Sequence, residues 1–198
     1  MTGLFEEPDN ATPVSPEERR DLRQTWIITR SDLNEAEQAN IQQALTWARG
    51  SRYRRVEDIL NENFACALHR RMFSDVWKWA GRYRLSEKTI GIDFRRIAVE
   101  MLQAFDDSAF WFANETFLPD EQAVRLHHRL VQIHPFVNGN GRHTRLMADL
   151  LIERLGGPPF SWGGGRLTDA GELRSRYIAA LKRADEHDIG PLIAFARS

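Results

Sequence analysis

The sequence predicts a mainly helical, all-α domain with one small β-hairpin, and three observations support this prediction. Most of the chain carries apolar residues at the three- and four-residue spacing of helices. Helix start and stop signals flank these stretches, for example the capping spacing of Asp32 and Glu35 and the later Gly50. Only residues 82–94 break the helical spacing, because apolar and polar residues alternate there on both sides of a polar SEK turn.

The expected helices each show an apolar stripe at helical spacing. In chain order they are residues 33–48, 56–73, 98–113, 120–133, 144–154, 168–184 and 190–196. The first begins directly after Asp32 and ends before Gly50, and the fifth follows a glycine-rich turn. The hairpin is expected between the second and third helices, and the GGPPFSWGGG segment at 156–165 is a loop by composition.

A chain of 198 residues fits a single domain, here expected over residues 26–198. An extended N-terminal arm is expected over residues 1–25, because three prolines lie there among acidic and small residues. The formal net charge of −1 gives no field that favours nucleic acid or a membrane, so neither is an expected partner. The sequence shows no secretory signal and no apolar run of about 20 residues, which predicts a cytoplasmic protein.

Residues 134–145, with the sequence HPFVNGNGRHTR, are the most informative part of the chain. A glycine-rich turn that opens a helix leaves backbone N–H groups unpaired, and these groups suit an anion. Arg142 and Arg145 are three residues apart, so they share a helix face, and guanidinium groups match phosphate oxygens. His134 precedes the turn and can take a proton near neutral pH. The segment therefore predicts phosphate binding beside a base, and phosphoryl-type transfer.

This segment resembles the signature of the Fic family, HxFx(D/E)GNGRxxR. The matching positions are His134, Phe136, Gly139, Asn140, Gly141, Arg142 and Arg145. Asn138 departs from the pattern, because the family has Asp or Glu at that position. The segments 76–84 and 172–185 are also similar to family segments, and residues 29–41 are similar to the subgroup called mobile mystery protein B. The resemblance implies the Fic fold, a helical core with a β-hairpin flap.

The resemblance implies a protein adenylyltransferase, which transfers AMP from Mg²⁺·ATP to a Ser, Thr or Tyr hydroxyl of a target protein. His134 would be the general base, and Phe136 would point into the core and fix the loop. Backbone N–H groups of Gly139, Asn140 and Gly141, with the Asn140 side chain, would bind phosphate. Arg142 and Arg145 would bind the β- and γ-phosphates. Asn138 would occupy the metal-ligand position, and an amide brings no charge to a Mg²⁺ ion.

The predicted hairpin also has a function in the family, where a flap holds the target segment by strand addition. Tyr83, Lys88, Ile90 and Gly91 are the candidate target-binding residues, and the sequence does not choose among them. The alternative is an ordinary surface hairpin, since exposed edges are more often protected than used.

A second family motif, (S/T)xxxE(G/N), carries a glutamate that pairs with the second motif arginine and blocks activity. Ser31 and Glu35 have its spacing, although Ala36 replaces the final Gly or Asn, so Glu35 is a candidate inhibitor that contacts Arg145. The alternative is a glutamate that merely starts a helix. Without such an internal inhibitor, a separate antitoxin-like protein would be the expected regulatory partner.

Other functions compatible with the motif are transfer of a different phosphate-containing group, AMP removal, or an inert nucleotide-binding regulatory module. Doc-like kinases of the superfamily have Lys-Arg where this chain has Gly141 followed by Arg142, which argues against that branch. A DNA-binding regulator has little support, because the charge is balanced and no recognition helix stands out.

Overall fold

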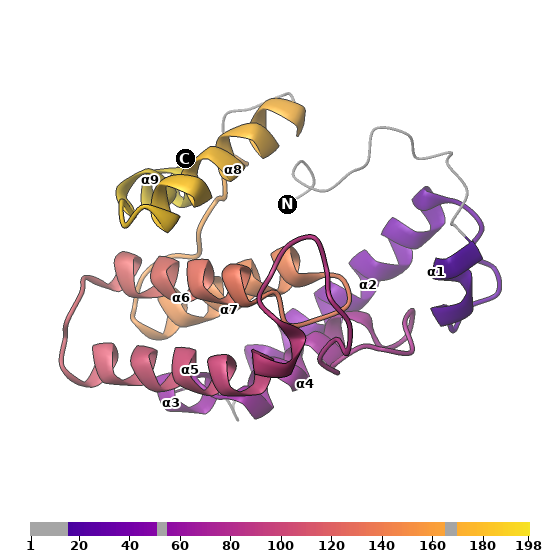
Figure 1. Ribbon diagram of the computed structural model, residues 1–198, viewed down its shortest axis with the longest axis horizontal. Coiled ribbons are helices and arrows are strands. Elements are labelled where there is room, and N and C mark those ends of the chain that lie inside the picture. Colours follow the sequence, from indigo (N-terminus) through magenta and orange to yellow (C-terminus); the bar gives the residue numbers. More distant parts are fainter. Residues whose placement is uncertain (1–15, 51–54, 165–169) are drawn as a thin grey trace.

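A computed structural model describes residues 16–50, 55–164 and 170–198, and the described part is mainly helical, as predicted (Figure 1). Its helices are α1 (Pro16–Asp21), α2 (Arg30–Ala48), α3 (Val56–Ile59), α4 (Glu62–Phe73), the 3₁₀ turn η1 (Phe94–Arg96), α5 (Ile97–Ala113), α6 (Pro119–Ile133), α7 (Asn140–Arg154), α8 (Ala170–Asp185) and α9 (Gly190–Arg197). Among the described helices, none is long and apolar enough to cross a membrane.

Helices α6 and α7 form the centre of the packing. Helix α7 packs on α6, on α3 and on α4, and α6 also contacts α5 and α9. Helix α2 packs along α4, and α8 and α9 pack on each other as a pair, which Figure 1 shows in yellow. Eleven of the residues of α7 are buried, which explains why this helix lacks a polar face. The motif at residues 134–145 therefore ends within a helix that its neighbours enclose.

The predicted β-hairpin is wrong: the described residues contain no β-strand, and residues 82–94 form a loop that ends at η1 (Figure 1). Across 16–50, 55–164 and 170–198, strand-like pairing is limited to two isolated bridges, Leu22 with Trp77 and Tyr83 with Phe136. The physical reason lies in Arg84. Its buried guanidinium donates to the backbone carbonyls of Ser86 and Ile92 within the loop, so these carbonyls need no partner strand.

Several helix boundaries also differ from the predictions, and α7 begins at Asn140, four residues before the predicted start at residue 144. The helix expected over 56–73 is divided into α3 and α4, because the Asn61 side chain accepts from Phe64 N at 2.8 Å and starts a new helix. Residues 16–21, expected within an extended arm, form α1, and Lys78 N donates to Asp21 O at 2.9 Å. This part of the arm therefore lies on the domain. Residues 1–15 of the predicted arm lie outside the described residues.

The N-terminus of α2 is three residues earlier than predicted, because the capping pair is different. Thr29 accepts from Asp32 N at 3.2 Å, and the Asp32 carboxylate accepts from Thr29 N at 2.9 Å. These reciprocal bonds make Asp32 the third residue of the helix rather than its cap. They also hold the pKa of Asp32 below its usual value, chiefly through the Thr29 backbone N–H.

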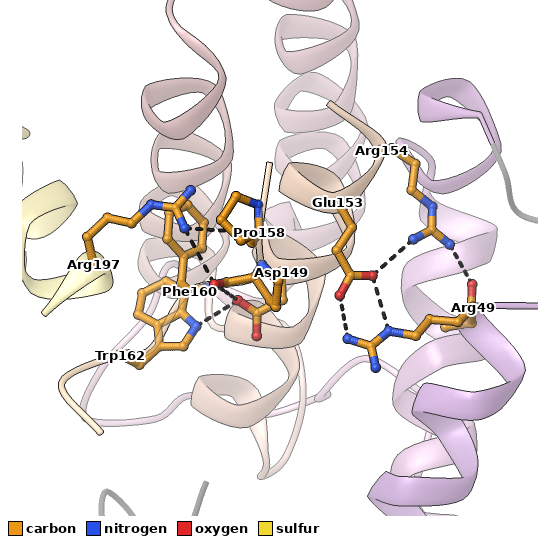
Figure 2. A network of polar contacts seen from close by, with 10 residues as sticks. Arg49, Asp149, Glu153, Arg154, Pro158, Phe160, Trp162 and Arg197 are labelled. Atoms are coloured by element: carbon orange, nitrogen blue, oxygen red, sulfur yellow. Dashed lines mark hydrogen bonds and ion pairs between the residues drawn. The ribbon is translucent and has the colours of Figure 1, made fainter. Parts of the chain in front are cut away.

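Polar contacts fix the C-terminal half of α7 against α2 (Figure 2). Arg49 donates from Nε to Glu153 at 3.1 Å, and Arg154 donates to Ala48 O at 2.8 Å. The second contact satisfies a carbonyl at the C-terminus of α2, where no helical N–H group is available. Helix α2 is thus anchored along the helix that carries the motif.

A buried carboxylate joins α7 to the segment before α8 (Figure 2). Asp149 accepts from Trp162 Nε1 at 2.9 Å and from Phe160 N at 3.2 Å. Burial raises the pKa of Asp149 to about 6, and these two donors act against that effect. Arg197 of α9 donates to Pro158 O at 2.8 Å, so the same segment is also held from the C-terminal helix.

Candidate active site

The glycine-rich turn has the geometry of an anion-binding helix start. Gly139 is the N-cap of α7 with φ of 76°, and a Cβ on it would lie 2.6 Å from the Phe73 ring, so only glycine fits. The first bond within the helix runs from His143 N to Gly139 O. Helix geometry therefore leaves the N–H groups of residues 140–142 without acceptors inside α7. These groups and the helix dipole suit a phosphate.

The Asn140 side chain, expected to donate to phosphate, is instead part of the turn. Its Oδ1 accepts from Phe136 N at 2.9 Å, and its Nδ2 donates to Phe136 O at 2.8 Å. The side chain is buried, at 3% exposure, so this reciprocal pair has no competition from water. Asn140 therefore closes the turn into a ring, and only its backbone N–H is left for an anion. Phe136 is fully buried, as predicted for a residue that fixes the loop.

His134 terminates α6 in a left-handed conformation, with φ of 51° and ψ of 61°. Its ring is partly buried, and burial lowers the pKa of His134 to about 4, with smaller contributions from the positive charges of Arg84 and Lys88. The imidazole is therefore neutral at pH 7, which is the form that accepts a proton. The arrangement meets the electrostatic requirement for the predicted general base.

The four candidate target-binding residues separate into two groups. Tyr83 faces the protein, with its ring 5.7 Å from the Phe136 ring, whereas Gly91 is exposed but lies so close to the site that a Cβ on it would be 2.7 Å from His134 Cβ. Lys88 and Ile90 are exposed, Ile90 at 60%. Lys88, Ile90 and Gly91 are therefore placed to meet another molecule, while Tyr83 supports the loop from inside.

The two motif arginines lie in different surroundings. Arg142 is one-quarter exposed, forms an ion pair with Glu37 of α2 and lies 4.9 Å from the centre of the Phe73 ring. Arg145 is 8% exposed, and burial lowers its pKa to about 10, so it remains charged at neutral pH. Arg142 is thus at the edge of the site, and Arg145 is enclosed beneath it.

The glutamate that reaches the motif is Glu37 rather than the predicted Glu35. Glu37 is 3% exposed and accepts from Trp77 Nε1 at 2.6 Å in addition to pairing with Arg142. Ser31 and Glu35 are exposed on α2. The reason is helical geometry: Glu37 follows the buried Leu33 by four residues, so it shares the inward face, whereas Glu35 points away. The helical spacing of the sequence could have identified Glu37.

Asn138, the candidate metal ligand, is exposed, and its Oδ1 accepts from Gly139 N at 2.7 Å. No group of three or more His, Cys, Asp or Glu side chains able to hold a metal occurs among the residues described. A neutral amide oxygen is a weak anchor for Mg²⁺ on its own, so the donors fit an ion that arrives with the phosphates of a nucleotide.

His69 of α4 is a contributor to the site that sequence reasoning left unassigned. Its Nδ1 accepts from Gly81 N at 2.9 Å, and its Nε2–H donates to Asn138 O at 3.0 Å. The ring stacks on Phe136 with centroids 3.7 Å apart and is fully buried, and burial holds the pKa of His69 well below its usual value. A histidine on the apolar face of a helix carries no local signal for this role.

Comparison with known proteins identifies the class. Residues 59–152 match the family model described as Fic/DOC family, a range that includes the whole motif. The chain is a Fic/DOC family protein, related to Fic protein adenylyltransferases.

Two curated relatives are protein adenylyltransferases by name. Protein adenylyltransferase Fic of Drosophila willistoni is 37% identical over 98 residues, which are 48% of this chain and 18% of that protein. Protein adenylyltransferase fic-1 of Caenorhabditis briggsae is 31% identical over 145 residues, which are 71% of this chain and 26% of that protein. The chain therefore spans only a small part of the length of these relatives.

Solved structures share the mainly helical Fic-like fold. Fic-1 (residues 134–508) from C. elegans has a TM-score of 0.61 and 24% identity, over 80% of this chain and 46% of that one. The N-terminal FIC domain of Bep8 from Bartonella sp. 1-1C has a TM-score of 0.66 and 14% identity, over 87% and 88%. BepC from Bartonella tribocorum, solved with bound AMPPNP, has a TM-score of 0.61 and 17% identity, over 85% and 86%.

Proposed function

We propose that the chain is a protein adenylyltransferase that transfers AMP from Mg²⁺·ATP to a hydroxyl side chain of a target protein. The observation that carries the proposal is a neutral imidazole, His134, followed after a short turn by the N-terminus of α7. One group accepts a proton and the other stabilises negative charge, as in-line attack on a phosphate requires. The adenylyltransferase relatives and the AMPPNP bound to BepC support ATP as the nucleotide.

In this mechanism the target hydroxyl oxygen attacks the α-phosphorus while His134 removes the hydroxyl proton. The bond from the α-phosphorus to the bridging oxygen breaks, and pyrophosphate leaves with Mg²⁺, which enters as part of the substrate. The N–H groups of residues 140–142 stabilise the charge on the transferring phosphate. Arg142 and Arg145 neutralise the leaving pyrophosphate. For Arg142 this requires that the guanidinium leaves Glu37.

The proposal is tested with ATP labelled at either the α- or the γ-phosphate. The chain is incubated with Mg²⁺ and a protein extract, and protein-bound label is measured beside mass spectrometry for an AMP adduct. Retention of the α-label alone supports adenylylation. Retention of the γ-label indicates phosphoryl transfer. Release of AMP from an adenylylated protein indicates hydrolytic AMP removal, and nucleotide binding without any transfer, with a target present, indicates an inert regulatory module.

The ion pair between Glu37 and Arg142 gives the proposed enzyme an internal inhibitor. We expect Glu37→Gln to raise AMP transfer by about 10-fold, equivalent to about 1.4 kcal/mol, because Arg142 is then free to bind phosphate. The free energy of unfolding should fall by about 1–3 kcal/mol, because a buried pair loses one partner. Glutamine keeps the acceptor for Trp77. Transfer and urea unfolding are measured together.

The exposed Glu35 offers the matched control. Glu35→Gln should change neither transfer nor stability beyond about 0.5 kcal/mol, the usual effect of a surface substitution. An unchanged rate in Glu37→Gln, or an equal gain in both variants, would contradict the inhibitory role of Glu37. In that event an antitoxin-like protein remains the proposed source of inhibition.

Asn138 should set the Mg²⁺ requirement of the reaction. We expect Asn138→Asp to lower the Mg²⁺ concentration for half-maximal transfer severalfold, because a carboxylate is a harder and charged ligand. The Gly139 N–H can donate to an oxygen of either side chain, so the turn is kept. The measurement is a Mg²⁺ titration at saturating ATP. An identical titration curve for the two proteins would exclude residue 138 from metal binding.

A further inference from the structure

Arg84 is a buried arginine whose guanidinium is bound by backbone carbonyls. It is 1% exposed. Its Nε donates to His134 O at 2.8 Å, its Nη1 donates to Ser86 O at 2.8 Å, and its Nη2 donates to Ile92 O. A buried charge is costly unless its donors are satisfied, so a single geometry of these carbonyls is strongly favoured. Arg84 therefore connects the end of α6 with both ends of the loop.

The conformation of His134 requires such support. A residue other than glycine in the left-handed region costs about 1–2 kcal/mol and persists only where its neighbours fix it. The carbonyl groups at the C-terminus of α6 also need donors from outside the helix. Arg84 supplies two such donors to the residues that follow α6: its Nε donates to His134 O, and its backbone N donates to Pro135 O at 2.9 Å. Ile92 N donates to Ile133 O at 3.4 Å and completes the cap.

The same contacts determine where the exposed part of the loop lies. Ser86 O and Ile92 O flank the tip that carries Lys88 and Ile90, and both carbonyls are held by one guanidinium. Gly91, with φ of 103°, lies so close that a Cβ on it would be 2.8 Å from Arg84 Nη2. The tip of the loop and the backbone of His134 consequently share one rigid support.

We propose that Arg84 is a positioning residue that fixes the imidazole of His134 and the target-facing tip of the loop relative to each other. This inference rests on the proposed adenylyltransferase function. Because Arg84 holds both parts, a target protein that binds to Lys88 and Ile90 presents its hydroxyl group to His134 at a fixed position. The charge of Arg84 also favours the neutral imidazole, together with burial and the charge of Lys88.

Two substitutions separate positioning from charge. Arg84→Lys keeps the charge but loses the planar fork that reaches three carbonyls at once. We expect it to lower kcat by about 10- to 100-fold with KM for ATP within about twofold, because a small displacement of the base is costly. Arg84→Gln removes the charge as well, and the pKa of His134 should then rise above about 4, while burial, the main cause of the shift, still holds it below its usual value.

The pKa is read by NMR titration of the histidine rings in the full chain, with His134→Ala to identify the resonance. Arg82→Gln is the matched control, since Arg82 is exposed on the same segment and should leave the rate and the titration unchanged. An unchanged His134 pKa in Arg84→Gln, with full activity in Arg84→Lys, would overturn the proposal. If circular dichroism shows that neither variant folds, Arg84 is structural only and the proposal also fails.

The titration does not depend on transfer activity. If the wild-type protein transfers no AMP but Arg84→Gln shifts the His134 resonance, the proposed function fails while the positioning of His134 stands. If transfer occurs and the Arg84 variants match the wild type in rate and titration, the proposed function stands and the positioning role is rejected.

Discussion

The His134→Ala variant should lose AMP transfer by about 10²- to 10⁴-fold, the usual contribution of a general base. The expected loss is in kcat, because in the proposed mechanism the N–H groups of residues 140–142 and the arginines bind the nucleotide, and the imidazole does not. Label incorporation from α-labelled ATP measures the effect, and nucleotide binding is measured in parallel. The fold should be retained, since alanine replaces a partly exposed ring.

His187 provides a matched control for this substitution. It is a second histidine with a left-handed backbone, with φ of 68°, and its side chain is exposed. His187→Ala therefore carries the same backbone cost and leaves the motif intact, so transfer should stay at the wild-type rate. Equal activity of His134→Ala and the wild type would remove His134 as the base and with it the proposed mechanism.

The pH dependence of kcat/KM gives an independent check, because this quantity reports the base of the free enzyme. An ordinary histidine would halve the rate near pH 6.5. With the pKa of His134 lowered to about 4, the acidic side of the profile should be flat down to the pH at which the protein unfolds. A midpoint near pH 6.5 would contradict the described burial of the ring.

A second large effect is expected in the stability of the fold against acid. His69, His127 and His143 are fully buried, and burial is the main cause that lowers the pKa of each. The pKa is about 3 for His127 and about 4 for both His143 and His134. Each side chain stays neutral in the folded protein while the unfolded chain takes up a proton near pH 6.5.

The sign of the effect follows from proton linkage. Between about pH 6.5 and pH 4 the unfolded state binds more protons than the folded state, so the free energy of unfolding falls as the pH falls. Each pKa unit corresponds to about 1.4 kcal/mol. Asp149 acts in the opposite direction, because its raised pKa of about 6 makes the folded state bind a proton first. Since one carboxylate opposes four histidines, we expect a net loss of about 3 kcal/mol or more from pH 7 to pH 5.

Urea unfolding at pH 7, 6 and 5 measures this loss. Its slope with pH gives the number of protons taken up on unfolding. His127→Gln should reduce the slope by about one proton, because it removes one of the buried groups with a lowered pKa. A free energy of unfolding that is constant or rises toward pH 5 would show that the buried histidines are already protonated or hydrated in the folded protein.

Much of the fold was readable from local patterns. The helical spacing of apolar residues predicted α5, α6 and α9 to within about two residues, because amphipathic periodicity is a property of neighbouring residues. The glycine-rich turn before α7 was also predicted, since the left-handed Gly139 is required by its own backbone geometry. The division at Asn61 was missed because an apolar pattern continues across it, and only the side-chain cap marks the new helix.

The sequence by itself determined the helical class, the turn that opens α7 and the residue types of the Fic motif. Tertiary structure decided how these residues are used: Glu37 pairs with Arg142 while Glu35, expected to contact Arg145, is exposed. The Asn140 side chain closes the turn, and Arg84 replaces strand pairing in the loop. The physical reason is the range of the forces involved. Backbone geometry and helix periodicity act between near neighbours, whereas burial and pairing depend on residues that packing brings together from distant parts of the chain.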